Sequence, residues 1–210
     1  MSGSRVAKSR STKRLAFINV PYANRYEKIY LAFIAGAAAY GLLPTAAVHD
    51  PSSRFQLDRI CEMIAAASYS FHDLSWMSVD NKQPRTPRLN MTFELGLAVA
   101  FSRSRRREHR WIVFDTVPYR LQKALSDLGG IRPRIYDGTP VGLLRELMSA
   151  LQREKHRPTL PNLVAVYREL ETAARRIKRT YSRDLFDTRP FTDLRWAAQQ
   201  AAKVHVASLA

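Results

Sequence analysis

The feature that most constrains the fold is an alternation of short apolar segments with longer segments of helical period between residues 15 and 155. Short apolar runs bounded by turn residues predict buried strands, and apolar residues spaced by three and four predict helices. Strands are expected at 15–20, 42–48, 68–75, 111–117 and within 132–138. Helices are expected at 24–40, 54–67, 91–102, 119–127 and 139–155. This alternation predicts an α/β fold with a parallel sheet of about five strands and helices on both faces.

The pattern changes after residue 157, where two amphipathic helices are expected at 161–181 and 191–209. We therefore expect a basic tail over 1–14, an α/β domain over 15–157 and a helical C-terminal extension over 158–210. The extension either packs on the main domain or joins two subunits. Within the sheet, Pro44 indicates that its strand lies at an edge or contains a bulge, because proline cannot donate a ladder hydrogen bond.

The chain is strongly basic, with 34 Lys and Arg against 18 Asp and Glu and a net charge of +16. The basic residues cluster at 1–14, 103–110, 153–157 and 175–179. Such a field attracts polyanions and phosphate-bearing ligands, so non-specific contact with nucleic acid is a hypothesis. Solvated basic faces are the more ordinary explanation of such clusters, since no DNA- or RNA-binding motif accompanies the charge.

Several classes of protein are disfavoured by the motifs. The first strand is followed by PYANRYEK and not GxGxxG, and neither GxxxxGK[ST] nor GxSxG occurs. Cys61 is the single cysteine, so neither a disulfide nor a cysteine-based zinc site is expected, and a reducing cytoplasm is the natural compartment. No metal or cofactor is expected from the scattered histidines. No apolar stretch suffices to span a membrane, and the tail lacks the apolar segment of a secretory signal.

Acidic residues mark the carboxyl ends of the expected strands. Asp50, Asp73 and Asp115 each follow a strand, at the edge where open parallel sheets bind ligands. Glu94 lies about one turn into an apolar helix that Asn90 is expected to cap. Burial would raise the pKa of Glu94, while the helix start would oppose that shift. Two carboxylates converging at a strand edge, here Glu94 and Asp73, are typical of glycosidic cleavage.

A family resemblance adds to this interpretation. The segments FINVPY (17–22), HDLS (72–75) and NMTFELGLAVAF (90–101) resemble the nucleoside 2-deoxyribosyltransferase family over roughly residues 15–117. The same architecture resembles Toll/interleukin-receptor (TIR) domains, in which a helix glutamate serves NAD glycohydrolysis. The resemblance implies a flavodoxin-like fold and makes Glu94 the nucleophile. One difference is Asn90, which stands where the family has an acidic residue, so the resemblance implies cleavage more than transfer to a second base.

The expected enzyme acts on the N-glycosidic bond of a nucleoside, nucleotide or NAD-like molecule. Glu94 would attack the anomeric carbon or stabilise the transition state, and Asp73 would hold sugar hydroxyls or assist proton transfer. The remaining candidate substrate-binding residues follow the strands or precede the helix of Glu94: Pro21, Tyr22, Asn24, Arg25, His72, Ser75, Arg85, Arg88 and Asn90. The structural alternatives are a helix-start acid for Glu94, a turn former for Asp73 and a satisfied strand histidine for His72.

Two other functions stay open on the sequence. The same pocket could bind a nucleotide without cleaving it, with the C-terminal helices passing a signal to a partner or forming a homo-oligomer. Alternatively, the basic clusters could make the chain a nucleic-acid-associated protein.

Overall fold

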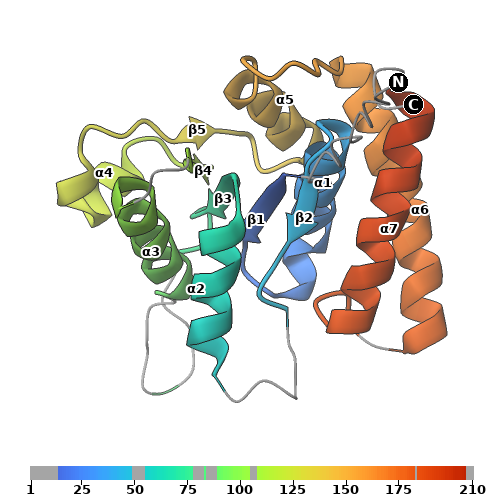
Figure 1. Ribbon diagram of the computed structural model, residues 1–210, viewed down its shortest axis with the longest axis horizontal. Helices are drawn as coiled ribbons and strands as arrows, with labels where there is room; N and C mark the ends of the chain where they lie inside the picture. The colour runs from blue at the N-terminus through green and yellow to red at the C-terminus, as the bar shows by residue number, and fades with distance from the viewer. Residues whose placement is uncertain are drawn as a thin grey trace, which may run out of the picture.

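The predicted strands form a single parallel sheet in the computed structural model, which describes residues 14–48, 55–77, 83, 89–104, 108–182 and 184–206 (Figure 1). The strands are β1 (Leu15–Asn19), β2 (Leu43–Thr45), β3 (Tyr69–Asp73), β4 (Arg110–Asp115) and β5 (Arg134–Ile135). Their order is β2-β1-β3-β4-β5, and every neighbouring pair is parallel. The α/β flavodoxin-like prediction is confirmed, and the strand of Pro44 lies at the edge of the sheet as its proline indicated.

The helices cover both faces of the sheet. α1 (Glu27–Ala39), which follows the short helix η1 (Asn24–Tyr26), and α5 (Pro140–Ala150) pack together on one face. The other face carries α2 (Gln56–Ala66), α3 (Asn90–Ser104) and α4 (Arg120–Ala124), the last followed by η2 (Ser126–Leu128). The strand alternation fits this arrangement: Ala16 and Ile18 join the core of α1, whereas Phe17 between them joins the core of α2 and α3.

The C-terminal helices form a third layer of helices, outside α1. α6 (Leu160–Tyr181) and α7 (Thr188–His205) pack against each other and against α1 (Figure 1). The α1 helix is consequently buried at every position from Ile29 to Ala39, and it shares one hydrophobic core with the buried residues of α6 and α7. Since α1 packs on the sheet, the described part of the C-terminal extension is packed on the α/β domain through a common core.

Local chemistry explains several helix boundaries. Thr159 and Asn162 form a capping box at the start of α6, and the Thr139 hydroxyl accepts a hydrogen bond from the Gly142 amide at the start of α5. The predicted cap at Asn90 is off by one residue. The carbonyl of Leu89 already accepts the Phe93 amide at 2.9 Å, so Asn90 is the first helical residue.

Other predicted boundaries are too long or shifted. The second strand ends at Thr45 and not 48, the helix after β5 ends at Ala150 and not 155, and α7 begins at Thr188 and not 191. Within the described residues no helix is long and apolar enough to cross a membrane.

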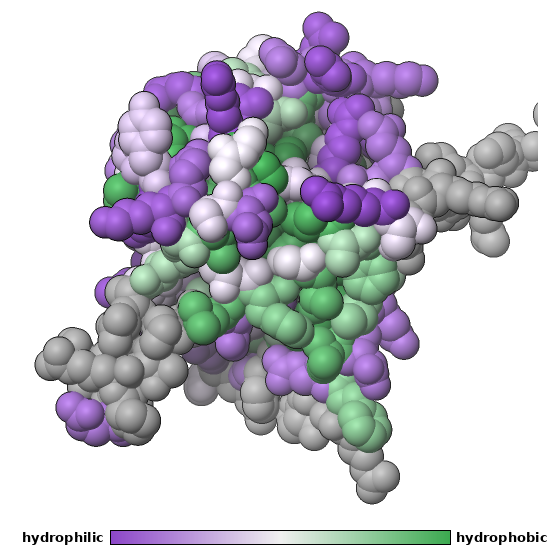
Figure 2. Space-filling model, turned by 90° about the vertical axis from the view of Figure 1, so that its left-hand side faces the viewer, coloured by the Kyte–Doolittle hydropathy of each residue, from purple (hydrophilic) through white to green (hydrophobic). Residues whose placement is uncertain are grey.

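Figure 2 turns the side that includes α4 toward the viewer and shows hydrophobic side chains gathered between hydrophilic ones. Exposed large apolar residues of α3 and of the turn before α4 are Phe93, Val117 and Tyr119.

Candidate functional site

The candidate site lies at the carboxyl edge of the sheet between β1 and β3, where the strand order reverses. Open parallel sheets bind ligands at such points. Asn19, the last residue of β1, pairs with His72 of β3 in the sheet register. The Asn19 side-chain amide donates hydrogen bonds to His72 Nδ1 at 2.8 Å and to the Met91 carbonyl at 2.9 Å. This side chain therefore ties the reversal point to α3, the helix of Glu94.

A buried chain of hydrogen bonds continues from His72 along β3. Because the Asn19 amide is the donor, His72 Nδ1 is the acceptor and Nε2 carries the ring proton. Nε2 therefore donates a hydrogen bond to Ser70 Oγ at 2.9 Å. The Ser70 hydroxyl can then donate to His109 Nε2 at 3.0 Å, and His109 Nδ1 donates to the Ala67 carbonyl at 2.9 Å. Burial, helped by the nearby His109, lowers the pKa of His72 to about 3. His72 is neutral and fully buried, and both of its ring nitrogens are hydrogen-bonded, so its role at the site is structural.

Glu94 lies on α3, three residues after Met91, whose carbonyl accepts the Asn19 amide. Its side chain is only partly exposed. Within the described part of the chain, no hydrogen bond or ion pair reaches its carboxylate. Removal from water disfavours the charged form and raises the pKa of Glu94 to about 7. Near neutral pH this residue is divided between acid and carboxylate, a condition that suits proton transfer or nucleophilic attack.

Tyr22 is the predicted substrate-binding residue whose environment includes Glu94. Burial raises the pKa of Tyr22, the charge of Glu94 raises it further, and Arg59 of α2 lowers it. The Tyr22 ring packs against Phe186, with 5.2 Å between ring centroids. Arg59 also donates a hydrogen bond to the Val48 carbonyl just after β2. A phenol, a carboxyl group and a guanidinium thus converge beside the ends of β1 and β2.

Asp73 takes part in a separate network. It is fully buried at the end of β3, where Oδ1 accepts the Ser75 amide at 2.8 Å and Oδ2 accepts the Tyr136 hydroxyl at 2.8 Å. Tyr136 belongs to the core of α1 and α5, on the face of the sheet opposite α3. Burial raises the pKa of Asp73, and its hydrogen bonds oppose the shift. The expected convergence of Asp73 with Glu94 is not seen among the described contacts, because the strand pleat turns Asp73 away from α3.

A layered group of side chains lies beside Asp73. The rings of Tyr26 and Trp76 stack at 5.4 Å with an interplanar angle of 8°, and the Arg25 guanidinium lies 3.3 Å from the centre of the Trp76 ring. The Tyr26 hydroxyl and Ser75 Oγ are hydrogen-bonded at 2.6 Å. Arg25 and Ser75 were predicted to bind substrate, and the structure brings them into one cluster through two aromatic residues that the sequence did not single out.

The third acidic strand end is neutralised internally. Asp115, fully buried as the last residue of β4, forms an ion pair with Arg120 of α4, and its Oδ1 also accepts the amides of Thr116 and Val117. Arg120 further donates to the Leu74 carbonyl at 2.9 Å. Asp115 therefore has a structural partner that Glu94 lacks among the described residues.

The remaining candidates are dispersed. Pro21 is buried, whereas Asn24 and Asn90 are exposed. Arg85, Arg88 and Asp50 lie outside the described residues.

Five residues of these networks were not predicted from the sequence: Arg59, Tyr26, Trp76, Tyr136 and Arg120. Tyr136 directly follows β5 and Trp76 lies three residues after β3, so both could have been found as aromatic residues near strand ends, whereas Arg59 gives no signal inside its amphipathic helix. No group of three or more His, Cys, Asp or Glu residues arranged to hold a metal occurs in the described ranges.

Comparison with protein-family models, curated proteins and solved structures gives no match for this chain. The fold and the geometry of the site therefore carry the functional argument.

Proposed function

We propose that the protein binds a nucleoside, nucleotide or NAD-like molecule at the β1–β3 reversal point and cleaves its N-glycosidic bond with Glu94. The observation that carries this proposal is the Glu94 carboxyl group: it lies near the carboxyl edge of the sheet where the strand order reverses, its pKa is raised to about 7, and no described side chain pairs with it. The resemblance of the Glu-Leu-Gly helix to the nucleoside 2-deoxyribosyltransferase family supports the same role.

The proposed chemistry uses Glu94 as its carboxylate. A Glu94 oxygen attacks the anomeric carbon while the bond from that carbon to the base nitrogen breaks, and the bond electrons leave with the base. Water then attacks the anomeric carbon of the glycosyl ester, which releases the sugar and restores the carboxylate. The proton lost by the water passes to the base that left as an anion, or to solvent where the leaving group, as in NAD, departs uncharged. The Tyr22 phenol keeps its proton because its pKa is raised, so it can donate a hydrogen bond at this position. Asp73, which is committed to Ser75 and Tyr136, has no direct part in this step.

The test is release of free base from NAD and from a panel of nucleotides and nucleosides, followed by chromatography. We expect release by the wild-type protein and its loss in Glu94→Gln. The matched control is Glu62→Gln on α2, an exposed residue that undergoes the same chemical change away from the site. Release that survives Glu94→Gln contradicts the catalytic assignment.

A second candidate is a binding module that recognises the same ligand without cleaving it. The observation in its favour is that no second carboxyl group from the described residues affects the pKa of Glu94, so the usual acid partner of a glycosidase is not in evidence there. In that case Glu94 would accept a hydrogen bond from a ribose hydroxyl. Tight binding by calorimetry, weakened in Glu94→Gln and without release of base, would favour this module over the enzyme.

A further inference from the structure

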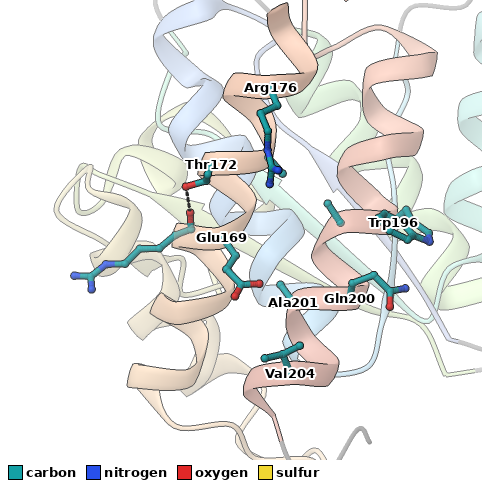
Figure 3. A pocket seen from close by; sticks show the side chains of 10 residues that line it. Glu169, Thr172, Arg176, Trp196, Gln200, Ala201 and Val204 are labelled. Atoms are coloured by element: carbon teal, nitrogen blue, oxygen red, sulfur yellow. Dashed lines mark hydrogen bonds between the residues drawn. The ribbon is translucent and has the colours of Figure 1, made fainter. Parts of the chain in front are cut away.

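A second surface feature lies far along the chain from Glu94, in the groove between α6 and α7. The groove has a volume of about 580 Å³ and is lined by residues of these two helices (Figure 3). Figure 3 shows Glu169 and Arg176 reaching from α6 toward the space beside α7, whose wall carries Trp196, Gln200 and Val204. The opposite side of the helix pair contacts α1, so this groove is the outward side of the third layer.

The groove exposes apolar surface that the fold does not require. The Trp196 side chain is 65% exposed and Val204 is 72% exposed, although they lie on the same helix as the fully buried Leu194. Ala173, Ala197 and Ala201 also line the groove, and these small side chains leave the space that a bulkier residue would fill. A large exposed aromatic next to a floor of small residues is typical of a binding surface, where tryptophan and arginine contribute most to affinity.

The groove also carries unbalanced positive charge. Arg168 and Arg176 line it eight residues apart on α6, and in the described part of the chain neither guanidinium takes part in an ion pair. Glu169, the acidic residue of the lining, is hydrogen-bonded to His205 at 2.8 Å. Eight residues of helix span about 12 Å, so the two arginines are separated by roughly two helical turns.

We propose that this groove binds an acidic amphipathic helix of another protein. The apolar face of that helix would lie over the alanines and against Trp196, and carboxylates about two turns apart would pair with Arg168 and Arg176. A partner helix has the same rise per residue as α6, so carboxylates eight positions apart on a helix parallel to α6 would be separated by the same distance as the two arginines. This surface would connect the ligand-binding domain to a partner, because α6 and α7 share their core with α1.

Two other occupants fit less well. A single-stranded nucleic acid binds by stacking successive bases, and among the described residues that line this groove Trp196 is the single aromatic one. A second copy of the chain would bring two basic surfaces together in a protein whose net charge is +16. Both occupants are outcomes that the experiment separates.

The experiment selects binders from a displayed library of 18-residue helical peptides, using the full-length protein as the target. We expect the selected peptides to carry Asp or Glu beside a leucine-rich face. Arg168→Glu/Arg176→Glu should weaken their binding at least tenfold in fluorescence anisotropy, and Trp196→Ala should weaken it comparably. Replacing the peptide carboxylates by lysine should restore binding to the double variant. All three substituted residues are exposed, so folding is expected to be retained.

The matched control is Arg153→Glu/Lys155→Glu, which makes the same change in charge at exposed positions outside the groove and should leave peptide binding unchanged. Equal loss in the control pair, or selection of neutral or basic peptides, overturns the proposal. It is also overturned if fifteen-residue oligothymidylate binds more tightly than every peptide and loses affinity in Trp196→Ala. A dimer that becomes monomeric in Trp196→Ala would instead identify a second copy as the occupant.

Discussion

The side-chain amide of Asn19 lies 2.8 Å from His72 Nδ1, and the same nitrogen lies 2.9 Å from the Met91 carbonyl. One residue at the end of β1 therefore fixes both the neighbouring strand and the first turn of the helix that carries Glu94. His72 accepts this hydrogen bond only while it is neutral, which explains why a buried histidine with a pKa of about 3 is compatible with the site.

The first prediction concerns that amide. Asn19→Ala should lower the free energy of unfolding by about 2–4 kcal/mol, because it leaves the buried His72 ring nitrogen without a donor and removes the side-chain bond to the Met91 carbonyl at the start of α3. Urea unfolding followed by circular dichroism measures the loss. Asn24→Ala, at an exposed position, should change stability by less than about 0.5 kcal/mol. An Asn19→Ala protein as stable as the wild type would show that the bridge contributes nothing.

The second prediction uses the raised pKa of Glu94. Between pH 4.5 and 7 the folded protein holds a proton on Glu94 that the unfolded chain releases, so this residue lowers stability as the pH rises. Glu94→Gln removes this term. The stability of Glu94→Gln relative to the wild type should therefore increase with pH across this window, by at most about 3 kcal/mol. Unfolding curves at several pH values measure the difference, and Glu62→Gln, the same substitution at an exposed position of α2, is the control.

Activity should follow the same group in the proposed reaction. Since Glu94 attacks as its carboxylate, the rate of base release should rise with pH and reach a plateau above an apparent pKa of about 7. The measurement is kcat/KM against pH for the best substrate of the panel. A rate that falls above pH 7 would instead assign Glu94 the role of proton donor.

Tyr22 offers a test of site geometry apart from folding. Tyr22→Phe keeps the ring that packs on Phe186 but removes the phenol next to Glu94. We expect a loss of about 1 kcal/mol or less in stability, together with a five- to tenfold loss of ligand affinity. Calorimetry with the active ligand checks this. Tyr26→Phe is the control, since its hydroxyl bonds Ser75 in the separate cluster. Equal losses of ligand affinity in both variants would show that the Tyr22 phenol makes no specific contribution to binding.

The sequence predicted the layout well because strand and helix periods are local properties. The five strands, the edge position of Pro44 and the placement of Glu94 one turn into its helix all follow from residues near each other in the chain. The convergence of Glu94 with Asp73 did not follow, because β3 is buried on both faces and its sequence does not show which of its side chains face α3. Asp73 accepts a hydrogen bond from Tyr136, which is 63 residues away and directly follows β5. Such long-range contacts leave no periodic signal.

The last prediction concerns the C-terminal layer, which the sequence left undecided between packing on the domain and joining subunits. Leu194 of α7 is fully buried in the core shared with α1, so Leu194→Ala should cost about 2–5 kcal/mol. Val204→Ala on the same helix, where the side chain is 72% exposed, should cost less than about 0.5 kcal/mol. If the layers share one core, Leu194→Ala must lower the transition seen by near-ultraviolet signals of the α/β domain as well. A variant whose C-terminal helices melt separately, while the sheet unfolds at the wild-type midpoint, would show that the two parts are energetically independent.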